Sequence, residues 1–473
     1  MNHSSAELDV LFVSDQPCWP LDQGFRLHGY QMIESLRRMN VRVGAASIEP
    51  LPEDAPAEFA GVNVTWPRAA ESDIAALKAG WGGPLSRLRH RLTRFEGLSI
   101  SDLAGVIQLV DRYRPRAVIG LGLRGPYLLA ALGGRSDIQR IWYAADELVR
   151  FHLSCMRYEA VRDWPARLVR LAHHAALERL LVPGVAGAIA VSPAEARWLH
   201  DVAGARRVET IRNGVDQDYF KPGLTSPRPR SLIFWGRLDF EPNIDAVRWF
   251  AGRVWPRVRS RWPDAVWTII GKGGGGAVES IRTTPGVELL GAVDDLRPHV
   301  AAASAAILPM RCGGGIKNKL LEAAAMGKAI LASPRAVDGL IGSDSLAPVA
   351  GERAGVRGEN VRPPNAQDSA DVITSFHPSP ILSPQRGEGS EAEQPPWLLC
   401  TSPDAWLNNL NRLWTYPDLA DDLSRRAVSW VRRHHTWDAA AVHLLDWLEM
   451  FPAPRRWRLS TARPTPAPLR QAA

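Results

Sequence analysis

The chain has 473 residues, of which 45% are hydrophobic and 23% are charged. This length suggests two or three domains of roughly 150 residues each, and the composition is typical of globular proteins. It excludes a wholly disordered chain, a collagen-like chain and a small disulfide-stapled scaffold. The net charge is +7, and only six of the 57 basic residues are lysine. This arginine-rich balance is compatible with a phosphate-bearing ligand or an anionic membrane surface.

The sequence carries no sign of export or of a membrane span. No apolar run approaches the ~20 residues that a membrane-spanning helix needs. The first residues, MNHSSAELDVLFVSD, lack a basic segment followed by an apolar one, so no secretory signal is expected. The four cysteines are far apart and form no CxxC pair, which argues against a zinc site and a disulfide framework (Cys18, Cys155, Cys312 and Cys400). These features favour the reducing cytoplasm.

The first half of the chain alternates short apolar runs with helical stretches. Residues 8–13 (LDVLFV) have the composition of a buried parallel strand, and the loop and helix at 24–39 place their apolar residues on one face. Further strands are predicted at 41–46, 117–120, 141–144 and 188–191. Strands separated by helices predict βαβ units in a parallel sheet.

The second half repeats this pattern after a proline-rich, turn-rich linker at 213–230. Its predicted strands are 231–235, 266–271, 287–290, 305–308 and 328–332. Its predicted helices are 246–258, 315–326, 403–413, 417–434 and 437–450. We therefore expect an N-terminal α/β domain at 1–212, a C-terminal α/β domain at 231–450 and a flexible tail at 451–473.

One segment differs from its surroundings. Residues 351–396 lack sustained periodicity and are rich in proline, glycine, serine and charge. This composition predicts a disordered and dispensable insertion within the C-terminal domain. It is either a long surface loop or the translation of an inserted palindromic DNA element, because GERAGVRG and SPQRGEG resemble opposite arms of such an element.

The strongest functional pattern is AAILPMRCGGGIKNKLLEAAAMGKAILA, in which a strand runs into three glycines and then a helix. Glycines, among them Gly314 and Gly315, let backbone N–H groups approach a ligand closely, and a helix N-terminus adds partial positive charge. Lys317 and Lys319 add two ammonium groups. The pattern therefore predicts a binding site for a diphosphate.

Glu322 lies one turn beyond Lys319 on the same predicted helix. A carboxylate there would repel phosphate, so it more plausibly accepts hydrogen bonds from sugar or ribose hydroxyls. The alternative is an ordinary glycine-rich turn beside a solvated Lys–Glu pair. The stretch matches neither GxxxxGK[ST] nor GxGxxG with an acid some twenty residues on, which disfavours P-loop and dinucleotide sites.

A second pattern, WGRLDFEPNID, follows the predicted strand at 231–235. Arg237 therefore stands at a carboxyl end of a strand, where open α/β sheets bind ligands. A guanidinium at that place can hold a diphosphate through two parallel hydrogen bonds. The alternative is a surface ion pair with Asp239.

Several of these stretches, in order, resemble the retaining glycosyltransferases of family 4 (group 1). They are NGVD, GRLDFEPN, TIIG, GAVDDLRPHV, ILPM, GGGIKNKLLEAAAMGKAI and HTWD. The N-terminal half is similar more weakly, in DQGFRLHGYQMIESLRRMNVRV and AADELVRFHL. The resemblance is closest to sugar transferases of bacterial exopolysaccharide clusters. It implies the GT-B fold, in which two Rossmann-like domains with parallel sheets face an interdomain cleft.

The resemblance also implies roles for single residues. Arg237 would contact the donor diphosphate, and Glu322 matches the second acid of an E-x7-E motif that holds the nucleotide ribose. Gly24 would lie in the loop nearest the donor phosphate. Asp146 is the candidate for a polar group of the N-terminal domain beside the transferred sugar, with a helix N-cap or a structural acid as its alternative. We expect Arg237, Lys319 and Asp146 to be the catalytic residues.

The sequence departs from the family pattern at two positions. Gly314 stands where the first acid of E-x7-E is expected, so the usual contact of that acid with the donor sugar is missing. Asn243 stands where a lysine is expected after Arg237. Lys317 and Lys319 would supply the missing charge from the opposite side of the site.

The implied reaction moves a hexose from a nucleoside-diphosphate sugar to a hydroxyl of a glycan or a lipid-linked acceptor, with retention. The cations and helix amides would stabilise the leaving diphosphate without a metal or another cofactor. The dispersed positive charge predicts no nucleic-acid partner. The alternatives are a sugar-nucleotide epimerase and a degenerate, non-catalytic nucleotide-sugar-binding protein.

Membrane contact is a further expectation. Residues 84–95 (PLSRLRHRLTRF) combine four arginines with three leucines at helical spacing. Such a basic amphipathic helix can rest on anionic lipid, on the inner face of the plasma membrane, where a lipid-linked acceptor would be available. A solvated helix of an arginine-rich protein is the alternative.

Overall fold

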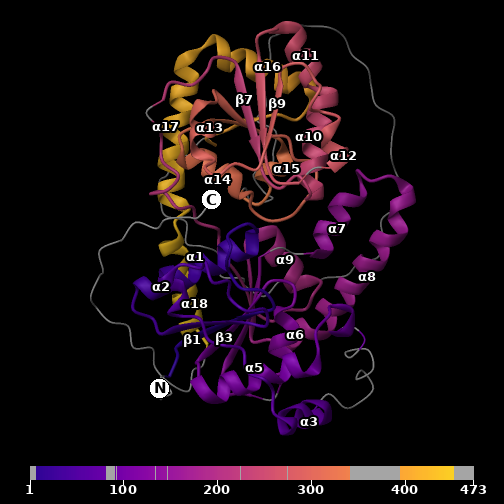
Figure 1. Cartoon of the computed structure of the whole chain (residues 1–473), viewed down its shortest axis with the longest axis vertical. Coiled ribbons are helices and arrows are strands. Elements are labelled where there is room, and N and C mark those ends of the chain that lie inside the picture. The colour runs from indigo at the N-terminus through magenta and orange to yellow at the C-terminus, as the bar shows by residue number, and fades with distance from the viewer. Residues whose placement is uncertain are drawn as a thin grey trace, which may run out of the picture.

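The computed structural model describes residues 7–451 except 81–90, 92, 134, 146–147, 224, 274 and 341–394. It contains two α/β lobes stacked along the long axis of the molecule (Figure 1). The N-terminal half of the chain forms the lower lobe in that view, coloured indigo to magenta. The predicted insertion, apart from its last two residues, most of the basic stretch at 84–95 and the tail lie outside the described residues.

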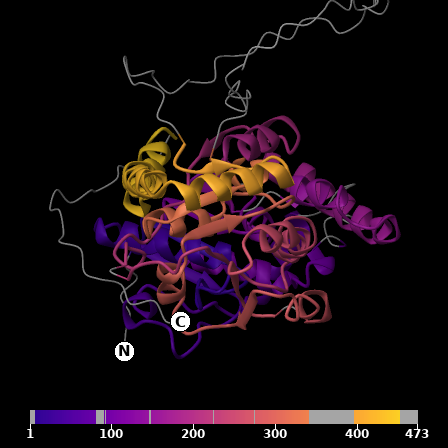
Figure 2. The same ribbon diagram turned by 90° about the horizontal axis from the view of Figure 1, so that it is seen from above.

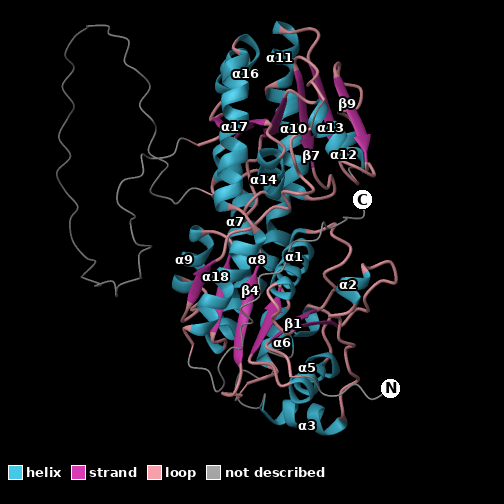
Figure 3. Cartoon of the chain, turned by 90° about the vertical axis from the view of Figure 1, so that its left-hand side faces the viewer, coloured by secondary structure: helices cyan, strands magenta, loops and turns pink. Residues whose placement is uncertain are grey.

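The N-terminal sheet has six parallel strands in the order β2-β1-β3-β4-β5-β6. They are β1 (Val10–Ser14), β2 (Val43–Ser47), β3 (Ala117–Leu121), β4 (Gln139–Ala144), β5 (Gly187–Ala190) and β6 (Val208–Thr210). The first three are buried along their whole length, because helices cover both faces of the sheet (Figure 3). The strands predicted from apolar runs are all present. The short β6 was not predicted, since its three residues form no apolar run.

The C-terminal sheet is also parallel, in the order β12-β11-β10-β7-β8-β9. Its strands are β7 (Ser231–Trp235), β8 (Val266–Ile270), β9 (Val287–Gly291), β10 (Ala305–Leu308), β11 (Ala329–Ala332) and β12 (Leu398–Leu399). β7, β10 and β11 are fully buried, whereas the edge strand β9 is partly exposed. The two parallel α/β units predicted from the sequence are confirmed.

Helices flank both sheets. Those of the lower lobe are α1 (Gly24–Arg38), α2 (Ala57–Ala60), α3 (Glu71–Gly80), α5 (Ile100–Tyr113), α6 (Gly125–Ala130), α7 (Leu148–Met156), α8 (Trp164–Leu181) and α9 (Pro193–Asp201). Those of the upper lobe are α10 (Glu241–Arg253), α11 (Trp255–Arg261), α12 (Gly275–Glu279), α13 (Arg297–Ala302), α14 (Asn318–Ala325), α15 (Pro334–Val337), α16 (Pro403–Thr415) and α17 (Pro417–His434). From above, the gold helices of residues 403–434 lie on one side of the orange strands (Figure 2).

Two helices differ from their predicted bounds. The helix expected at 246–258 is two helices, α10 and α11, because Pro256 has no N–H to continue the first one and instead stands near the start of the second. The helix expected at 315–326 begins only at Asn318, with Lys317 as its N-cap residue. No helix among the described residues is long and apolar enough to cross a bilayer.

The strand orders explain where a ligand site can form. Each order reverses once, between β1 and β3 in the lower sheet and between β7 and β10 in the upper one. Loops that leave neighbouring strands at such a reversal diverge and open a crevice at the carboxyl edge. The loops after β1, β7 and β10 all line the cleft between the lobes. These are the loops that carry the glycines and Arg237 singled out in the sequence.

The last helix, α18 (Trp437–Glu449), returns to the lower lobe. It packs along α1, and its buried face belongs to the same apolar cluster as Val10, Phe12 and Ile33 (Figure 1). Residues 437–450 were expected in the C-terminal domain, but α18 instead belongs to the core of the lower lobe. An amphipathic pattern shows that a helix has a buried face but does not identify the sheet that it covers.

The chain therefore crosses between the lobes twice, and the two crossings are hydrogen-bonded to each other. His435 Nδ1 lies 2.8 Å from the carbonyl oxygen of Asn213, and the N–H of Val215 donates to the carbonyl of His435 at 3.0 Å. A Cβ on Gly214 would lie 2.3 Å from the nitrogen of Trp437. The NGVD and HTWD stretches thus form one paired connection between the lobes, in which the closeness of the backbones requires a glycine.

Truncation of Trp447 on α18 tests whether this helix stabilises the lower lobe. Its indole packs against Gly187 and Phe451. Trp447→Ala is expected to reduce the free energy of unfolding by about 3–5 kcal/mol, because it leaves a cavity in a close-packed core. The matched control is Val442→Ala on the exposed side of the same helix, with an expected change within about 0.5 kcal/mol. Equal losses in urea denaturation of the two variants would contradict the assignment of α18 to the lower core.

Candidate active site

The cleft between the lobes encloses a cavity of about 460 Å³. The lower lobe contributes the loop after β1 and the first turns of α1, with Gly24 and His28. The upper lobe contributes the loops after β7 and β10 and the start of α14. Six of the eight site residues predicted from the sequence line this cavity (Gly24, Arg237, Gly314, Lys317, Lys319 and Glu322).

Arg237 extends from the end of β7 and is about half exposed. Its guanidinium makes two hydrogen bonds to the carboxylate of Asp239, at 2.9 and 3.0 Å. The hydrogen bond with Arg237 lowers the pKa of Asp239, and the same contact raises the pKa of the arginine. The ion pair that the sequence left as an alternative is therefore present, but it stands in the cleft wall. A diphosphate would have to share this guanidinium with Asp239 or replace it.

Lys319 lies in the first turn of α14, opposite the loop after β7. Its Nζ donates to Asn243 Oδ1 at 2.7 Å and stands 4.3 Å from the centre of the Phe234 ring. Burial lowers the pKa of Lys319 to about 7, against the opposing effect of Glu322. About half of these amines are therefore charged near neutral pH.

Asn243 connects the two sides of the site. While its Oδ1 accepts from Lys319, its Nδ2 donates to the backbone carbonyl of Arg237 at 2.8 Å. Gly236 has φ of 140°, and a Cβ there would lie 2.7 Å from Lys319 Nζ and 2.9 Å from Asn243 Nδ2. In place of the lysine expected at 243, the amide of Asn243 binds Lys319, which follows β10 in the chain. The glycine at 236 leaves the space that this contact needs.

Glu322 lies one turn further along α14. Its Oε2 accepts a hydrogen bond from the indole Nε1 of Trp235 at 2.7 Å. Burial raises the pKa of Glu322, although Trp235 and the charge of Lys319 oppose this shift. Since one carboxylate oxygen is held by Trp235, the group has a fixed orientation beside the cavity.

The glycine turn is shaped by left-handed backbone at Gly313 (φ 98°) and Gly315 (φ 65°), which other residues adopt only with strain. The amine of Lys317 donates to the carbonyl of Gly314. Two N–H groups of the turn are bound by the lower lobe: Gly313 donates to Ser154 Oγ at 3.0 Å, and Gly315 donates to Glu195 Oε1 at 2.7 Å. The turn is therefore a contact between the lobes as well as a wall of the cleft.

This arrangement corrects one expectation about the turn. Gly315 does not line the cavity, and its N–H is bound to a buried carboxylate, so it is not directed at a ligand in the cleft. Because α14 begins at Asn318, its positive end is formed by the N–H groups of the residues that follow Lys317. Asp146 lies outside the described residues; its neighbour Ala145 lines the cavity.

His28 is a cleft residue that the sequence analysis did not single out. It lies on α1 one turn after Gly24, and it is 4% exposed. Neither ring nitrogen has a hydrogen-bond partner of normal geometry among the described residues. Burial lowers its pKa to about 4, so the ring is neutral at pH 7. The sequence could have indicated this position, because His28 follows Gly24 by four residues and residues at that spacing share one face of a helix.

Ser154, Glu195 and Trp235 were also missed as part of the site. Ser192-Pro-Ala-Glu195 has the pattern of a capping box, and Ser192 Oγ does accept from the N–H of Glu195. The capping pattern by itself explains a glutamate at this position, so nothing in the sequence indicated that the carboxylate of Glu195 also accepts a hydrogen bond from another residue. Its contact with Gly315 depends on how the lobes meet.

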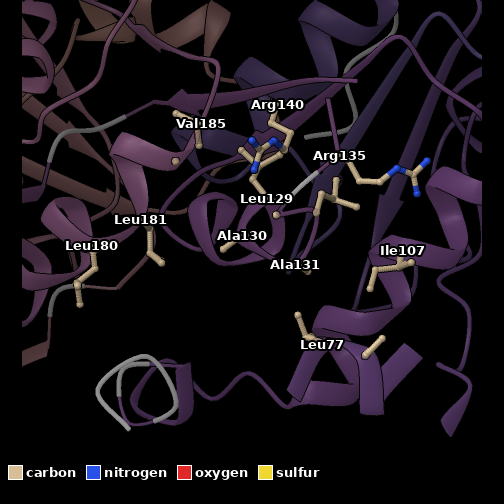
Figure 4. A pocket seen from close by; sticks show the side chains of 14 residues that line it. Leu77, Ile107, Leu129, Ala130, Ala131, Arg135, Arg140, Leu180, Leu181 and Val185 are labelled. Carbon is tan, nitrogen blue, oxygen red and sulfur yellow. The ribbon is translucent and has the colours of Figure 1, made fainter. Parts of the chain in front are cut away.

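A second cavity, of about 340 Å³, lies in the lower lobe (Figure 4). Its described lining is mainly leucine and alanine, with Arg135 and Arg140 as its charged members. Arg140 is near the start of β4 and Val185 precedes β5, so this cavity lies at the amino ends of the strands. Ligands of open α/β sheets bind at the opposite edge. The interlobe cleft is therefore the candidate active site.

Comparisons with known proteins agree with this geometry. Residues 229–363 match the family described as Glycosyl transferases group 1. This stretch of the chain is therefore similar to a glycosyltransferase group 1 domain. The matched range includes Arg237, the glycine turn and Glu322. No curated protein matches the chain.

Solved structures extend the similarity to both lobes. Sucrose-phosphate synthase from Thermosynechococcus elongatus aligns with a TM-score of 0.60 at 13% identity, over 93% of this chain and 98% of that one. HepE from Anabaena, in complex with UDP and glucose, gives 0.58 at 13% identity, over 94% and 100%. A glycosyltransferase from Rickettsia africae gives 0.58 at 10% identity, over 94% and 98%. These similarities show that the fold is GT-B.

The contact between Glu195 and the glycine turn of this GT-B chain can be tested by amide hydrogen exchange. Glu195→Ala is expected to speed exchange at Gly315 by about tenfold or more, because the N–H loses its charged acceptor. Glu195→Gln keeps an acceptor oxygen and serves as the matched control, with much smaller acceleration. Both variants alter the cap of α9, so exchange at 193–196 separates that effect. Equal exchange at Gly315 in both variants would contradict the contact.

Proposed function

We propose that the protein is a retaining glycosyltransferase that moves a hexose from a nucleoside-diphosphate sugar to a hydroxyl group. The observation that carries this proposal is the convergence, on one cavity of about 460 Å³, of three basic side chains and a fixed carboxylate from the upper lobe with a glycine-led helix from the lower lobe. HepE, which shares the fold, is known in complex with UDP and glucose. This supports a nucleoside-diphosphate sugar as the donor here.

The chemistry needs stabilisation of a leaving diphosphate. As the glycosidic bond breaks, negative charge grows on the phosphate oxygens, and fixed cations in a partly dry site stabilise it strongly. Arg237 follows β7 and Lys319 lies in the first turn of α14, and the side chain of Asn243 joins the two. The N–H groups at the start of α14 add partial positive charge from the same side. These groups make a metal unnecessary for charge stabilisation in the proposed mechanism.

The remaining groups suit the nucleoside and the sugar. Glu322, oriented by Trp235, has an oxygen available to accept hydrogen bonds from the ribose hydroxyls. Gly24 has no heavy atom within 4 Å of the place where a Cβ would stand, so a phosphate or sugar can approach its backbone. His28 offers neutral ring nitrogens from the lower lobe, on the side where the transferred sugar would lie. Asp146 remains proposed as a catalytic polar group near that sugar.

Retention follows from the family resemblance and is part of the proposal. In this mechanism the acceptor would attack from the side that the phosphate leaves, and the phosphate would help to deprotonate it, so no carboxylate pair of the kind that glycosidases use is required. The acceptor, a glycan or lipid-linked glycan of exopolysaccharide synthesis, would bind the lower lobe in the cytoplasm. Peripheral contact with anionic lipid through 84–95 belongs to the same proposal.

Gly314 favours one alternative, a nucleotide-sugar-binding protein without transfer activity. A glycine cannot supply the carboxylate that the family places there to contact the donor sugar. The two functions differ in one experiment, in which the chain is incubated with its donor in the presence and absence of glycan acceptors. Transfer to an acceptor supports the proposal, binding without turnover supports the alternative, and an epimerised donor without acceptor supports an epimerase.

Arg237 provides the mutational test of the donor site. A thermal-shift panel of UDP- and GDP-sugars first identifies the donor. With that donor, Arg237→Ala is expected to lower kcat/KM for transfer about 100-fold, since it removes a charge-assisted contact worth roughly 3 kcal/mol in the transition state.

Asp239→Asn is the matched control for this variant. It releases Arg237 from its ion pair without removing the guanidinium, so donor affinity should be unchanged or higher. Because Arg237 and Asp239 are both about half exposed, neither substitution should disturb folding. Near-normal transfer by Arg237→Ala would remove this residue from the diphosphate site.

The titration of Lys319 predicts the pH dependence of donor binding. A diphosphate favours the charged amine, so binding takes up a proton wherever the free residue, with a pKa of about 7, is deprotonated. Affinity should therefore fall about tenfold from pH 6 to pH 8. Lys319→Arg stays charged and should bind with little pH dependence in the same calorimetric titration. An identical slope in both proteins would exclude Lys319 as the titrating group.

A further inference from the structure

A cluster of metal-ligating side chains lies in the lower lobe, apart from the residues that line the cleft. Glu96 stands in the turn before α5, and His173 and His174 are neighbours on α8. One ligand atom from each of the three side chains lies within 4.8 Å of the other two. All three residues are at least nine-tenths buried, with exposures of 7%, 8% and 8%. Ionisable side chains are seldom buried without a partner, so the burial of these three groups together requires an explanation.

Hydrogen bonds within the protein leave this cluster incomplete. His173 Nε2 lies 2.6 Å from Glu96 Oε1, which accounts for one pair. His174 Nδ1, by contrast, is buried and has no hydrogen-bond partner among the described residues. Nε2 of His152, whose ring stacks on that of His174 at 5.1 Å, is in the same condition. Buried polar atoms in folded proteins are nearly always satisfied, so these unpartnered nitrogens point to a ligand of the cluster.

We propose that Glu96, His173 and His174 bind a divalent transition-metal ion, with Zn²⁺ as the best match. Two imidazoles and one carboxylate form a ligand set that zinc commonly accepts, with a fourth position for water or another donor. The cysteine spacing argued against a zinc site in the sequence, but this ligand set contains no cysteine. The site is independent of the proposed transfer reaction.

The charges around the cluster leave one oxygen of Glu96 available to a cation. Arg124 Nε lies 3.7 Å from the other oxygen of Glu96, and Asp15 offsets this arginine through a contact of 2.6 Å. Arg170 is a further cation that acts on His174. The carboxylate of Glu96 can therefore present one oxygen to the ion and the other to Arg124.

The geometry requires a small adjustment. Zinc–nitrogen and zinc–oxygen bonds of about 2.0–2.1 Å place tetrahedral ligand atoms roughly 3.3 Å apart. The pair His173–Glu96 is already closer than this, so the ring of His174, which follows on the same helix, has to turn toward them. Binding would tie the turn at Glu96 to α8. The ion is therefore structural, and it would stabilise the lower lobe.

Metal content tests this inference directly. The full chain, with any affinity tag removed, is incubated with zinc sulfate, desalted and analysed by elemental mass spectrometry. The wild type is expected to retain about one equivalent of zinc, whereas E96Q and H174A are expected to lose at least tenfold in affinity and to retain only traces. H200A removes an exposed histidine of the same lobe and should retain as much zinc as the wild type.

A second measurement guards against misfolded variants. Zinc should raise the melting temperature of the wild type by about 3 °C or more relative to EDTA. The melting temperature of E96Q should be the same in zinc and in EDTA. The melt of E96Q in EDTA also shows that this variant folds. The inference is overturned if the wild type retains no zinc after desalting, or if E96Q and H174A retain as much as the wild type, which would mean that the ion binds elsewhere.

Discussion

The hydrogen bonds of Asn243 hold the candidate active site together. They join the amine of Lys319, at the start of α14, to the backbone of Arg237, which follows β7. β7 and β10 are neighbours at the reversal of the strand order, so their loops leave in opposite directions and need a connection across the crevice. One amide side chain provides it, because it can donate and accept at once. Gly236 leaves the space in which this bridge forms.

The glycine turn extends this organisation to the other lobe. Its N–H groups are satisfied by Ser154 and Glu195, which belong to the helices after β4 and β5 of the lower sheet. A buried carboxylate that accepts a backbone hydrogen bond is a directional contact, so the turn is oriented by the lobe that faces it. Any motion that opens the cleft on this side has to break these bonds. The shape of the donor site is thus coupled to the contact between the lobes.

Sequence reasoning succeeded where a residue's role is local, and failed where the role depends on a distant partner. Apolar runs predicted five of the six strands in each sheet, because a parallel strand buried on two faces must be continuously apolar, whereas the edge strands β6 and β12 are too short to form such a run. Three glycines before a helix identified a turn at the crevice. The docking of α18 and the partner of Gly315 could not be predicted, because amphipathicity and capping patterns describe one element and not the surface it meets. The start of α14 at Asn318, and not at Gly315, also depends on a distant partner. The N–H groups of Gly313 and Gly315 donate to the lower lobe, so the turn does not join the helix.

Two of the three cations that line the cleft, Arg237 and Lys319, are restrained by the protein itself. Arg237 is neutralised by Asp239, and Lys319 loses part of its charge because burial favours the neutral amine. A cleft built in this way avoids the repulsion of two full positive charges held near each other in a poorly hydrated space. In the proposed donor complex, a diphosphate reverses both effects, because it attracts the guanidinium and favours protonation of the amine. The cleft would therefore reach its full positive charge only with the donor in place, when that charge stabilises the leaving group.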